Sequence, residues 1–136
     1  MSGGRPGAAH RVMLLGFGEF ERHALASYLR LAGSRALAYT QVESIAEADF
    51  VIADADHPGA IDAVLAADRV RDTVFIGALA PDGALAWAMR PIDPLQVFRE
   101  LGAVRAFALR EEIFREMRMA HVRDAGQRRT VLAPVV

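Results

Sequence analysis

DFVIADADHP, residues 49–58, is a short apolar run that ends in a carboxylate and then a proline. An apolar run of this length between charged residues is typical of a buried central strand in a parallel sheet. The strand would end at Asp54, and the carboxyl edge of a parallel sheet is where α/β folds hold their ligands. Asp54 is therefore the first candidate for a functional residue.

Strand and helix patterns alternate on both sides of this run. Strands are predicted over residues 11–15, 35–40, 73–77 and 84–89 besides the one ending at Asp54, and helices over 19–32, 58–68 and from Asp93 onward. Residues 44–48 have room for barely one helical turn, and residues 79–83 hold a turn. This alternation predicts five parallel strands joined by right-handed crossovers.

The composition limits the classes of protein to consider. The 136 residues are 53% hydrophobic with a formal net charge of -1, which indicates one folded domain and argues against a nucleic-acid binder driven by bulk charge. The chain has no cysteine, which excludes disulfides and thiolate metal sites, and we expect a cytoplasmic protein. No apolar run is long enough to span a membrane, and residues 1–10 are expected to form a flexible leader.

All 16 basic side chains outside histidine are arginine. A site that needs a compact ammonium group would therefore have to use a guanidinium instead.

Asp93-Pro94 is a strong helix start, with an N-cap aspartate and a proline at the first helical position. The helical pattern then runs to Gly126, about 30 residues or roughly 45 Å. Leu109, Ile113 and Met117 lie on one stripe of this segment. The segment is either a kinked pair of helices packed back on the domain, or a protruding helix that pairs with a second chain. Residues 108–126 are accordingly predicted as a helical extension and 127–136 as a linker.

Three parts of the chain resemble the receiver domain of two-component response regulators. They are the first strand with its helix, the run DFVIADADHP with Asp54 and Pro58, and MRPIDPLQVFREL at residues 89–101. The resemblance covers residues 11–107. It implies a flavodoxin-like, doubly wound α/β fold, here with shortened second and fourth helices and an extended C-terminal helix. It also implies a phosphoacceptor aspartate at Asp54 and a cis peptide between Arg90 and Pro91.

The chain departs from the family at the positions that carry its chemistry. The acidic pair that helps to hold Mg²⁺ falls on Gly16-Phe17, the switch hydroxyl falls on Gly77 or Ala78, and the lysine falls on Arg90. One remaining carboxylate cannot easily bind Mg²⁺, which prefers several oxygen ligands in octahedral order. We therefore expect a pseudo-receiver that is not an enzyme and holds no metal. Its vestigial pocket would comprise Gly16, Phe17, Asp54, Asp56, Gly77, Ala78, Arg90 and Pro91.

The expected function is regulation through a protein partner, an output domain or a second copy of the chain, without nucleic acid or membrane. Leu109, Ile113 and Met117 would form the contact between copies. Trp87 is expected in the core; the alternative is that it lies exposed where the fourth helix is missing and marks a contact surface.

Two alternatives remain at this point. One is a working receiver that uses Mg²⁺ and is phosphorylated on Asp54. The other is a nucleotide-binding module that uses Gly16 to Gly18, although its third glycine is missing and Glu19 and Glu21 stand where a phosphate would sit. The nucleotide fingerprint also requires an acid after the second strand, where Tyr39-Thr40-Gln41 stands.

Overall fold

The computed structural model describes residues 9–32 and 38–132, with the side chains of Ala32 and of residues 126–132 left aside. Its strands are β1 (His10–Leu15), β2 (Tyr39–Val42), β3 (Phe50–Asp54), β4 (Thr73–Ile76) and β5 (Ala86–Ala88). Its helices are α1 (Glu19–Ala32), α2 (Pro58–Ala66) and α3 (Pro94–Leu132), with one turn of 3₁₀ helix at Val70–Asp72.

The five strands form one parallel sheet in the order β2-β1-β3-β4-β5. This order confirms the predicted flavodoxin-like fold, with the crossover at β1 and β3 that leaves a crevice at the carboxyl edge. The predicted central strand is β3, which is paired on both sides. Its last residue, Asp54, is in register with Ile76 of β4.

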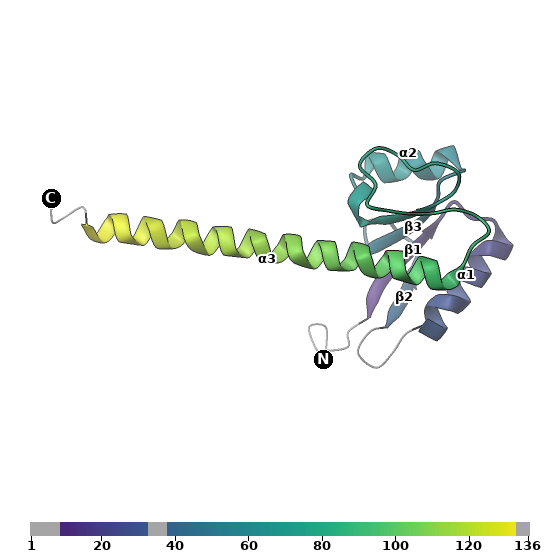
Figure 1. The fold of residues 1–136 in the computed structure, drawn as a ribbon, viewed down its shortest axis with the longest axis horizontal. Coiled ribbons are helices and arrows are strands. Elements are labelled where there is room, and N and C mark those ends of the chain that lie inside the picture. The colour runs from purple at the N-terminus through teal and green to yellow at the C-terminus, as the bar shows by residue number, and fades with distance from the viewer. Residues whose placement is uncertain (1–8, 33–37, 133–136) are drawn as a thin grey trace. The chain divides into compact units, whose positions relative to one another are not determined.

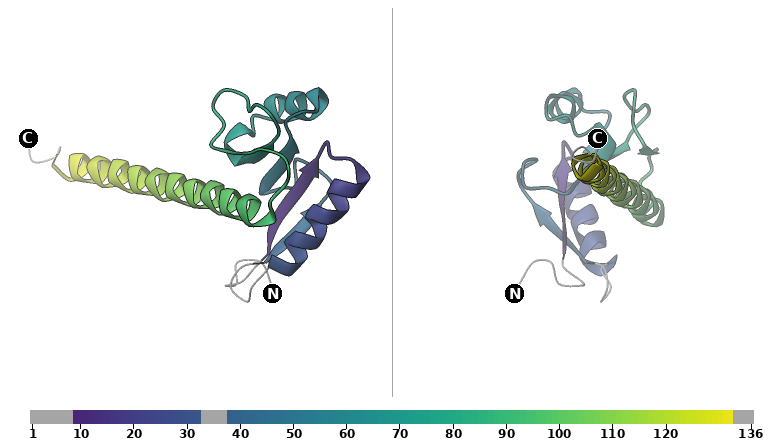
Figure 2. Two further views of the ribbon diagram at one scale, coloured as in Figure 1. Left: turned by 45° about the vertical axis from the view of Figure 1, so that its right-hand side comes forward. Right: turned by 90° about the vertical axis from the view of Figure 1, so that its left-hand side faces the viewer.

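Helices α1 and α2 lie on opposite faces of the sheet (Figure 1, Figure 2). On the α2 side, Val64 packs with Val51, Ala53 and Phe75. Because side chains alternate along a strand, the neighbouring residues face the other side. There the fully buried positions include Val12, Ile52 and Val74 of the sheet, Leu25 and Leu29 of α1, and Val97, Leu101 and Val104 at the start of α3.

Several predicted boundaries shift in the structure. The bounds of α1 agree with the prediction, and β1 begins at His10, the last residue of the expected leader. Strand β2 runs to Val42, two residues beyond the predicted end, while the start of the strand predicted at residues 35–40 falls partly outside the described residues. Residues 43–49 and 77–85 contain turns and no helix, so the second and fourth helices of the expected fold are absent, not merely shortened.

Arg69 compensates for the helix that is missing between β2 and β3. Its guanidinium donates to the carbonyl oxygens of Ile45 (2.9 Å), Ala48 (2.8 Å) and Asp49 (3.0 Å), and to the Asp72 carboxylate (2.8 Å). Backbone carbonyls that are partly buried without a partner are costly, and a helix would have satisfied some of them internally. One arginine thus donates hydrogen bonds to three backbone carbonyls of a short loop.

The segment after β5 is a single helix, α3, so the interpretation as a pair of helices is wrong. The Asp93 carboxylate accepts the Leu95 N–H at 3.0 Å, which confirms the predicted N-cap. The helix continues to Leu132, and residues 127–132, predicted as a linker, are helical. Contacts divide the chain into one unit up to Arg105 and a second from Ala106 onward. Within residues 9–32 and 38–132, no helix is both long and apolar enough to cross a bilayer.

Replacing Arg69 with alanine should lower the free energy of unfolding by about 2–4 kcal/mol, because three partly buried carbonyls lose a charged donor. Urea unfolding followed by circular dichroism measures this change. Arg99→Ala, at an exposed position on the first turns of α3, is the matched control and should stay within about 0.5 kcal/mol of the parent chain. Equal effects of the two substitutions would show that Arg69 does not hold the loop.

Candidate functional site

The candidate site lies at the carboxyl edge of the sheet, where β3 ends between β1 and β4. Asp54 is the last residue of β3, and its side chain is only 13% exposed. One of its oxygens, Oδ1, accepts the backbone N–H of Asp56 at 2.9 Å. This short turn directs the chain away from the sheet edge and places a second carboxylate, that of Asp56, next to the first.

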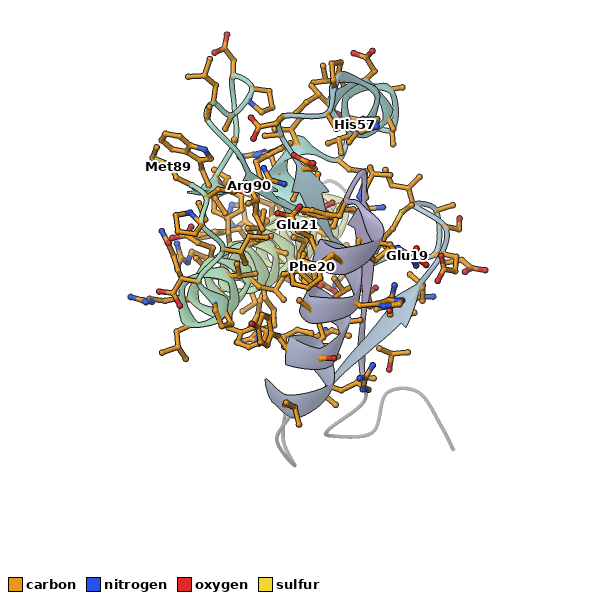
Figure 3. The ribbon with its side chains drawn as sticks, turned by 90° about the vertical axis from the view of Figure 1, so that its right-hand side faces the viewer. Glu19, Phe20, Glu21, His57, Met89 and Arg90 are labelled. Atoms are coloured by element: carbon orange, nitrogen blue, oxygen red, sulfur yellow. The ribbon has the colours of Figure 1, made fainter. Side chains whose placement is uncertain are left out.

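Arg90 reaches this edge from the segment that follows β5, and the Arg90-Pro91 peptide is cis, as the family resemblance implies. Its guanidinium contacts three carboxylates. The ion-pair distances are 2.7 Å to Asp56 Oδ2, 2.8 Å to Glu21 Oε1 and 3.2 Å to Asp54 Oδ2. Figure 3 shows Glu21, on the first turn of α1, beside Arg90. The guanidinium therefore joins α1, β3 and the loop after β3.

The Glu21 contact is bidentate. Arg90 donates from Nε to Glu21 Oε2 at 2.9 Å and from Nη2 to Glu21 Oε1 at 2.8 Å. These hydrogen bonds are the largest cause of a lowered pKa for Glu21, and they raise the pKa of Arg90, with Asp54 adding to that increase. Both side chains are about one-third exposed, at 32% and 30%, so solvent screens the pair. One guanidinium among three carboxylates leaves the cluster with a net negative charge.

The residues at this edge do not fit Mg²⁺. The position of the family's acidic pair is taken by Gly16 and Phe17, and Phe17 is buried in the core. Gly16 has φ 89°, and a Cβ there would lie 2.7 Å from the Ala60 Cβ, so an acidic side chain is not accommodated. The carboxylates nearby already converge on Arg90, and the described part of the chain offers no group of three or more histidine, aspartate or glutamate residues suited to a metal.

The Asp56 carboxylate lies against Gly77 and Ala78, the two residues that follow β4. Its Oδ1 accepts the backbone N–H of Ala78 at 3.0 Å. A Cβ on Gly77 would lie 2.8 Å from the same oxygen, so the glycine at this position makes room for the carboxylate. The position expected to carry a switch hydroxyl therefore carries none, and the adjacent amide donor is occupied by a neighbouring side chain.

The structure brings most of the predicted pocket together. Asp54 and Asp56 both contact Arg90, Asp56 also lies against Gly77 and Ala78, and Gly16 lies against Asp54. Phe17 lies elsewhere, with its side chain in the core. Pro91 adjoins the cluster, because the hollow that it lines beside α1 is also lined by Glu21 and Arg90.

Sequence reasoning missed Glu21 as a partner of Arg90. Glu21 was considered as a charge that repels phosphate and as an acid near the site of the missing metal-binding pair, not as the partner of an arginine. The available signal was its place in the first turn of the helix that follows β1, close to the sheet edge. That signal does not identify a partner that lies 69 residues further along the chain.

The expectation that Trp87 lies in the core is wrong, because the side chain is 41% exposed, as the alternative had it. Its Nε1–H donates to the Gly77 carbonyl oxygen at 2.8 Å, which holds the indole over the end of β4. The helix that would have covered β5 is absent. Leu79, Leu85 and Met89 are exposed in the same region for the same reason.

The expectation that no acidic residue follows the second strand, which counted against the nucleotide-binding alternative, is wrong. Strand β2 ends at Val42, so an acid, Glu43, does follow it directly. The other objections stand, because Glu19 and Glu21 occupy the first turn of α1, and Arg90 pairs with Glu21 there.

No family model and no curated protein sequence matches the chain. Among solved structures, the chemotaxis response regulator CheY4 of Vibrio cholerae is similar, with a TM-score of 0.50 and 17% sequence identity over 71% of this chain and 99% of that chain. The chain has the CheY-like receiver fold. At this identity the likeness shows the fold alone, and the chemistry of this receiver-like domain rests on its own residues.

Replacing Glu21 with glutamine should destabilise the receiver-like domain at neutral pH by about 0.5–1 kcal/mol, a value discounted for solvent screening. The pKa of Glu21 is lowered in the folded state, so its contribution is complete above the pKa of the unfolded chain and is lost as the pH falls through the folded pKa. The difference in unfolding free energy between parent and variant should therefore shrink below about pH 4.5. Urea titrations from pH 7 to pH 3 measure it.

Glu19→Gln, two residues earlier on the same turn, is the control for this experiment because Glu19 is exposed. Its difference from the parent should be small at every pH. A Glu21→Gln difference that does not change with pH would contradict the role assigned to the ion pair.

Proposed function

We propose that this receiver-like domain acts as a signalling module that is not phosphorylated and that works by binding protein, not by catalysis. The observation that carries the proposal is that the Arg90 guanidinium forms ion pairs with all three carboxylates at the carboxyl edge of the sheet.

The contacts of Asp54 disfavour its use as a nucleophile. Its Oδ1 accepts from the Asp56 N–H and from Arg90 Nη1, and its Oδ2 pairs with Arg90 Nη2. Phosphoryl transfer is catalysed mainly by positioning and by cations that neutralise charge on the transferring group. Here the nearby cation is already engaged by Asp54, Asp56 and Glu21, which supports a pocket that stays in one state.

The same pocket is close in sequence to the start of α3. Arg90 is followed by Pro91, and α3 begins at Pro94. The ion-pair cluster would therefore hold the segment that leads into this helix in one arrangement. We infer that the domain presents constant binding surfaces to a partner or to an output domain, and that signalling depends on whether the partner is present.

A titration with beryllofluoride and Mg²⁺ tests the absence of phosphorylation. In ¹H–¹⁵N NMR spectra, the amides of residues 54–57 and 77–78 should show no saturable shift, because the carboxylates are held by Arg90. Saturable shifts at these amides would favour the working receiver phosphorylated on Asp54 and would overturn the proposal. Mg²⁺ without beryllofluoride serves as the control for metal binding alone.

Arg90→Gln sharpens this experiment, because it removes the guanidinium and leaves the three carboxylates in place. This variant should bind Mn²⁺ weakly, seen as broadening of the same amide signals, whereas the parent chain should not. If parent and variant respond alike, the guanidinium is not what excludes the cation.

We further propose that α3 contributes a contact between two copies of the chain. Leu109, Ile113 and Met117 are 59%, 47% and 59% exposed and recur every four residues, which forms a stripe on one face of the helix. Large apolar side chains in such a stripe are typical of helices that pair with another helix. The stripe supports a homodimer, although it could also receive a helix of another protein.

The variant Leu109→Gln/Ile113→Gln/Met117→Gln should lose this contact while keeping the helix, because glutamine is a good helix former. Light scattering over a range of concentrations should show a smaller average mass than for the parent chain. Val122→Gln is the control, since Val122 is 64% exposed but lies on the face of the helix opposite Ile113, about two and a half turns further along. A parent chain that is monomeric at high concentration would overturn the proposed contact.

A further inference from the structure

The outer face of α1 carries the two most exposed large apolar side chains in the described part of the chain. Phe20 is 87% exposed and Leu31 is 82% exposed. They are 11 residues apart, which is close to three turns of helix, so both lie on the same face about 16 Å from each other. Leu25 and Leu29, which are buried against the sheet, lie on the opposite face.

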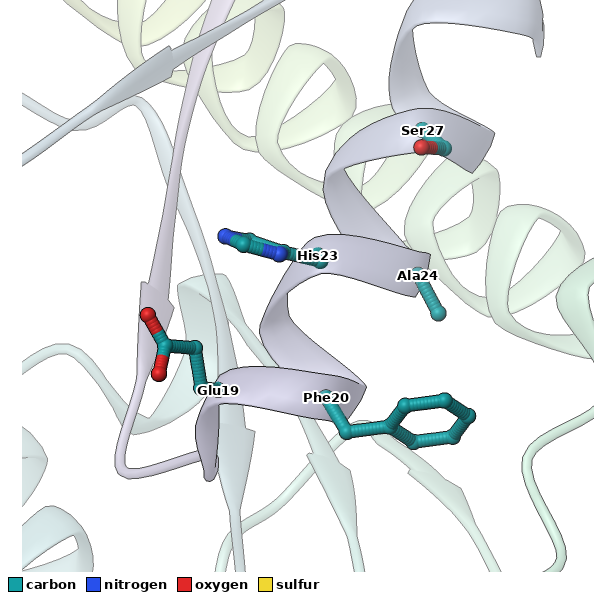
Figure 4. Close-up of a pocket in the computed structure, with 5 residues that line it drawn as sticks. All are labelled: Glu19, Phe20, His23, Ala24 and Ser27. Carbon is teal, nitrogen blue, oxygen red and sulfur yellow. The ribbon is translucent and has the colours of Figure 1, made fainter.

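Small side chains separate these two. Ala24 and Ser27 lie on the same stripe between Phe20 and Leu31, and the order along the helix is large, small, small, large. An open hollow of about 530 Å³ lies over this part of α1, lined by Glu19, Phe20, His23, Ala24 and Ser27. Figure 4 shows Glu19 and His23 along one flank of the hollow, with Phe20 and Ala24 along the other.

We propose that this face of α1 is a contact between two copies of the chain, in which the two α1 helices pack antiparallel about a twofold axis between Ala24 and Ser27. In that arrangement Phe20 of each copy packs on Leu31 of the other. Ala24 faces Ser27 across the axis, where small side chains allow the helices to approach closely. A twofold contact requires such a self-complementary pattern, because the same patch faces itself.

The charges on α1 are complementary in the same arrangement. Glu19 and Arg30 are both exposed, lie on one flank of the stripe and are also 11 residues apart. In an antiparallel pair, a flank faces the same flank of the other copy, so Glu19 of each copy faces Arg30 of the other. The midpoint of this pair lies one residue, about 1.5 Å along the helix, from the midpoint of Phe20 and Leu31, so one axis serves both. A hydrogen bond from Arg30 to Ser27 Oγ (3.1 Å) holds the guanidinium along the stripe.

This complementarity favours a second copy of the chain over an unrelated partner, because the side chains on this face of α1 are complementary in size and in charge to the same face of an antiparallel copy. The contact is separate from the α3 stripe. A chain with two self-complementary surfaces would form assemblies larger than a dimer at high concentration. A single helix face gives a small interface, so we expect the α1 contact to be weak when it acts alone.

Charge reversal tests the contact in the full-length chain. The three glutamine substitutions on the α3 stripe provide a background in which only α1 can mediate association, and sedimentation velocity gives the dissociation constant. Glu19→Arg and Arg30→Glu should each raise this constant about tenfold, because two ion pairs become repulsive. The two reversals combined in one chain should restore it to within about twofold, since every pair is then opposite in charge again.

Three measurements accompany the reversals. Phe20→Ser should abolish association in this background, and circular dichroism should show that the variant remains folded. Arg99→Glu makes the same change in charge at an exposed position on α3 and should leave the constant unchanged. The chain has no cysteine, so a mixture of the Ala24→Cys and Ser27→Cys chains should form a disulfide between the two copies on oxidation. A mixture of Ala24→Cys with Asp62→Cys, on the exposed side of α2, should not.

The outcomes separate this inference from the proposed function. A glutamine background that is monomeric while the parent chain is dimeric would overturn the α1 contact and support the α3 contact. A combined charge reversal that fails to restore association would also overturn the α1 contact. Rescue by the combined reversal supports it, because a damaged fold would not be repaired by a second damaging change.

Discussion

The guanidinium of Arg90 is the constraint on which the carboxyl edge of this sheet depends. Asp54 and Asp56 lie two residues apart at the end of β3, and Glu21 approaches them from α1. Three carboxylates at these positions would repel one another without a cation between them. A divalent ion could balance such a cluster if the site offered it enough free oxygen ligands. Here the Arg90 side chain supplies the positive charge between the three carboxylates.

A second arginine, Arg69, supplies hydrogen-bond donors to a connection that contains no helix. Two connections that usually contain helices are reduced to turns, and their backbone groups still need partners. Arg69 donates to the carbonyls of the connection before β3, and Trp87 donates to Gly77 in the connection after β4. Both donors are long side chains that reach backbone oxygens from outside the loop. The sheet therefore has the receiver topology although two of its connections contain no helix.

The absence of two covering helices and the ion pairs of Arg90 are both compatible with the proposed binding of a protein partner. Exposed apolar side chains occur near β5, on α1 and on α3. Surfaces of this kind on a folded domain often mark contacts with other proteins. The fold supplies a rigid support for them, while the chemistry that a receiver fold can host depends on individual side chains at the sheet edge.

Local patterns in the sequence were sufficient to predict most of the helices and strands. Hydrophobic periodicity fixed the bounds of α1, the apolar run ending at Asp54 identified the central strand, and Asp93-Pro94 marked the start of α3, because each pattern concerns neighbouring residues. The far end of α3 was misplaced because one glycine, Gly126, costs a helix only about 1 kcal/mol. The pairing of Arg90 with Glu21 and the exposure of Trp87 were decided only by tertiary structure. The first joins residues distant in the chain, and the second depends on which helices cover the sheet.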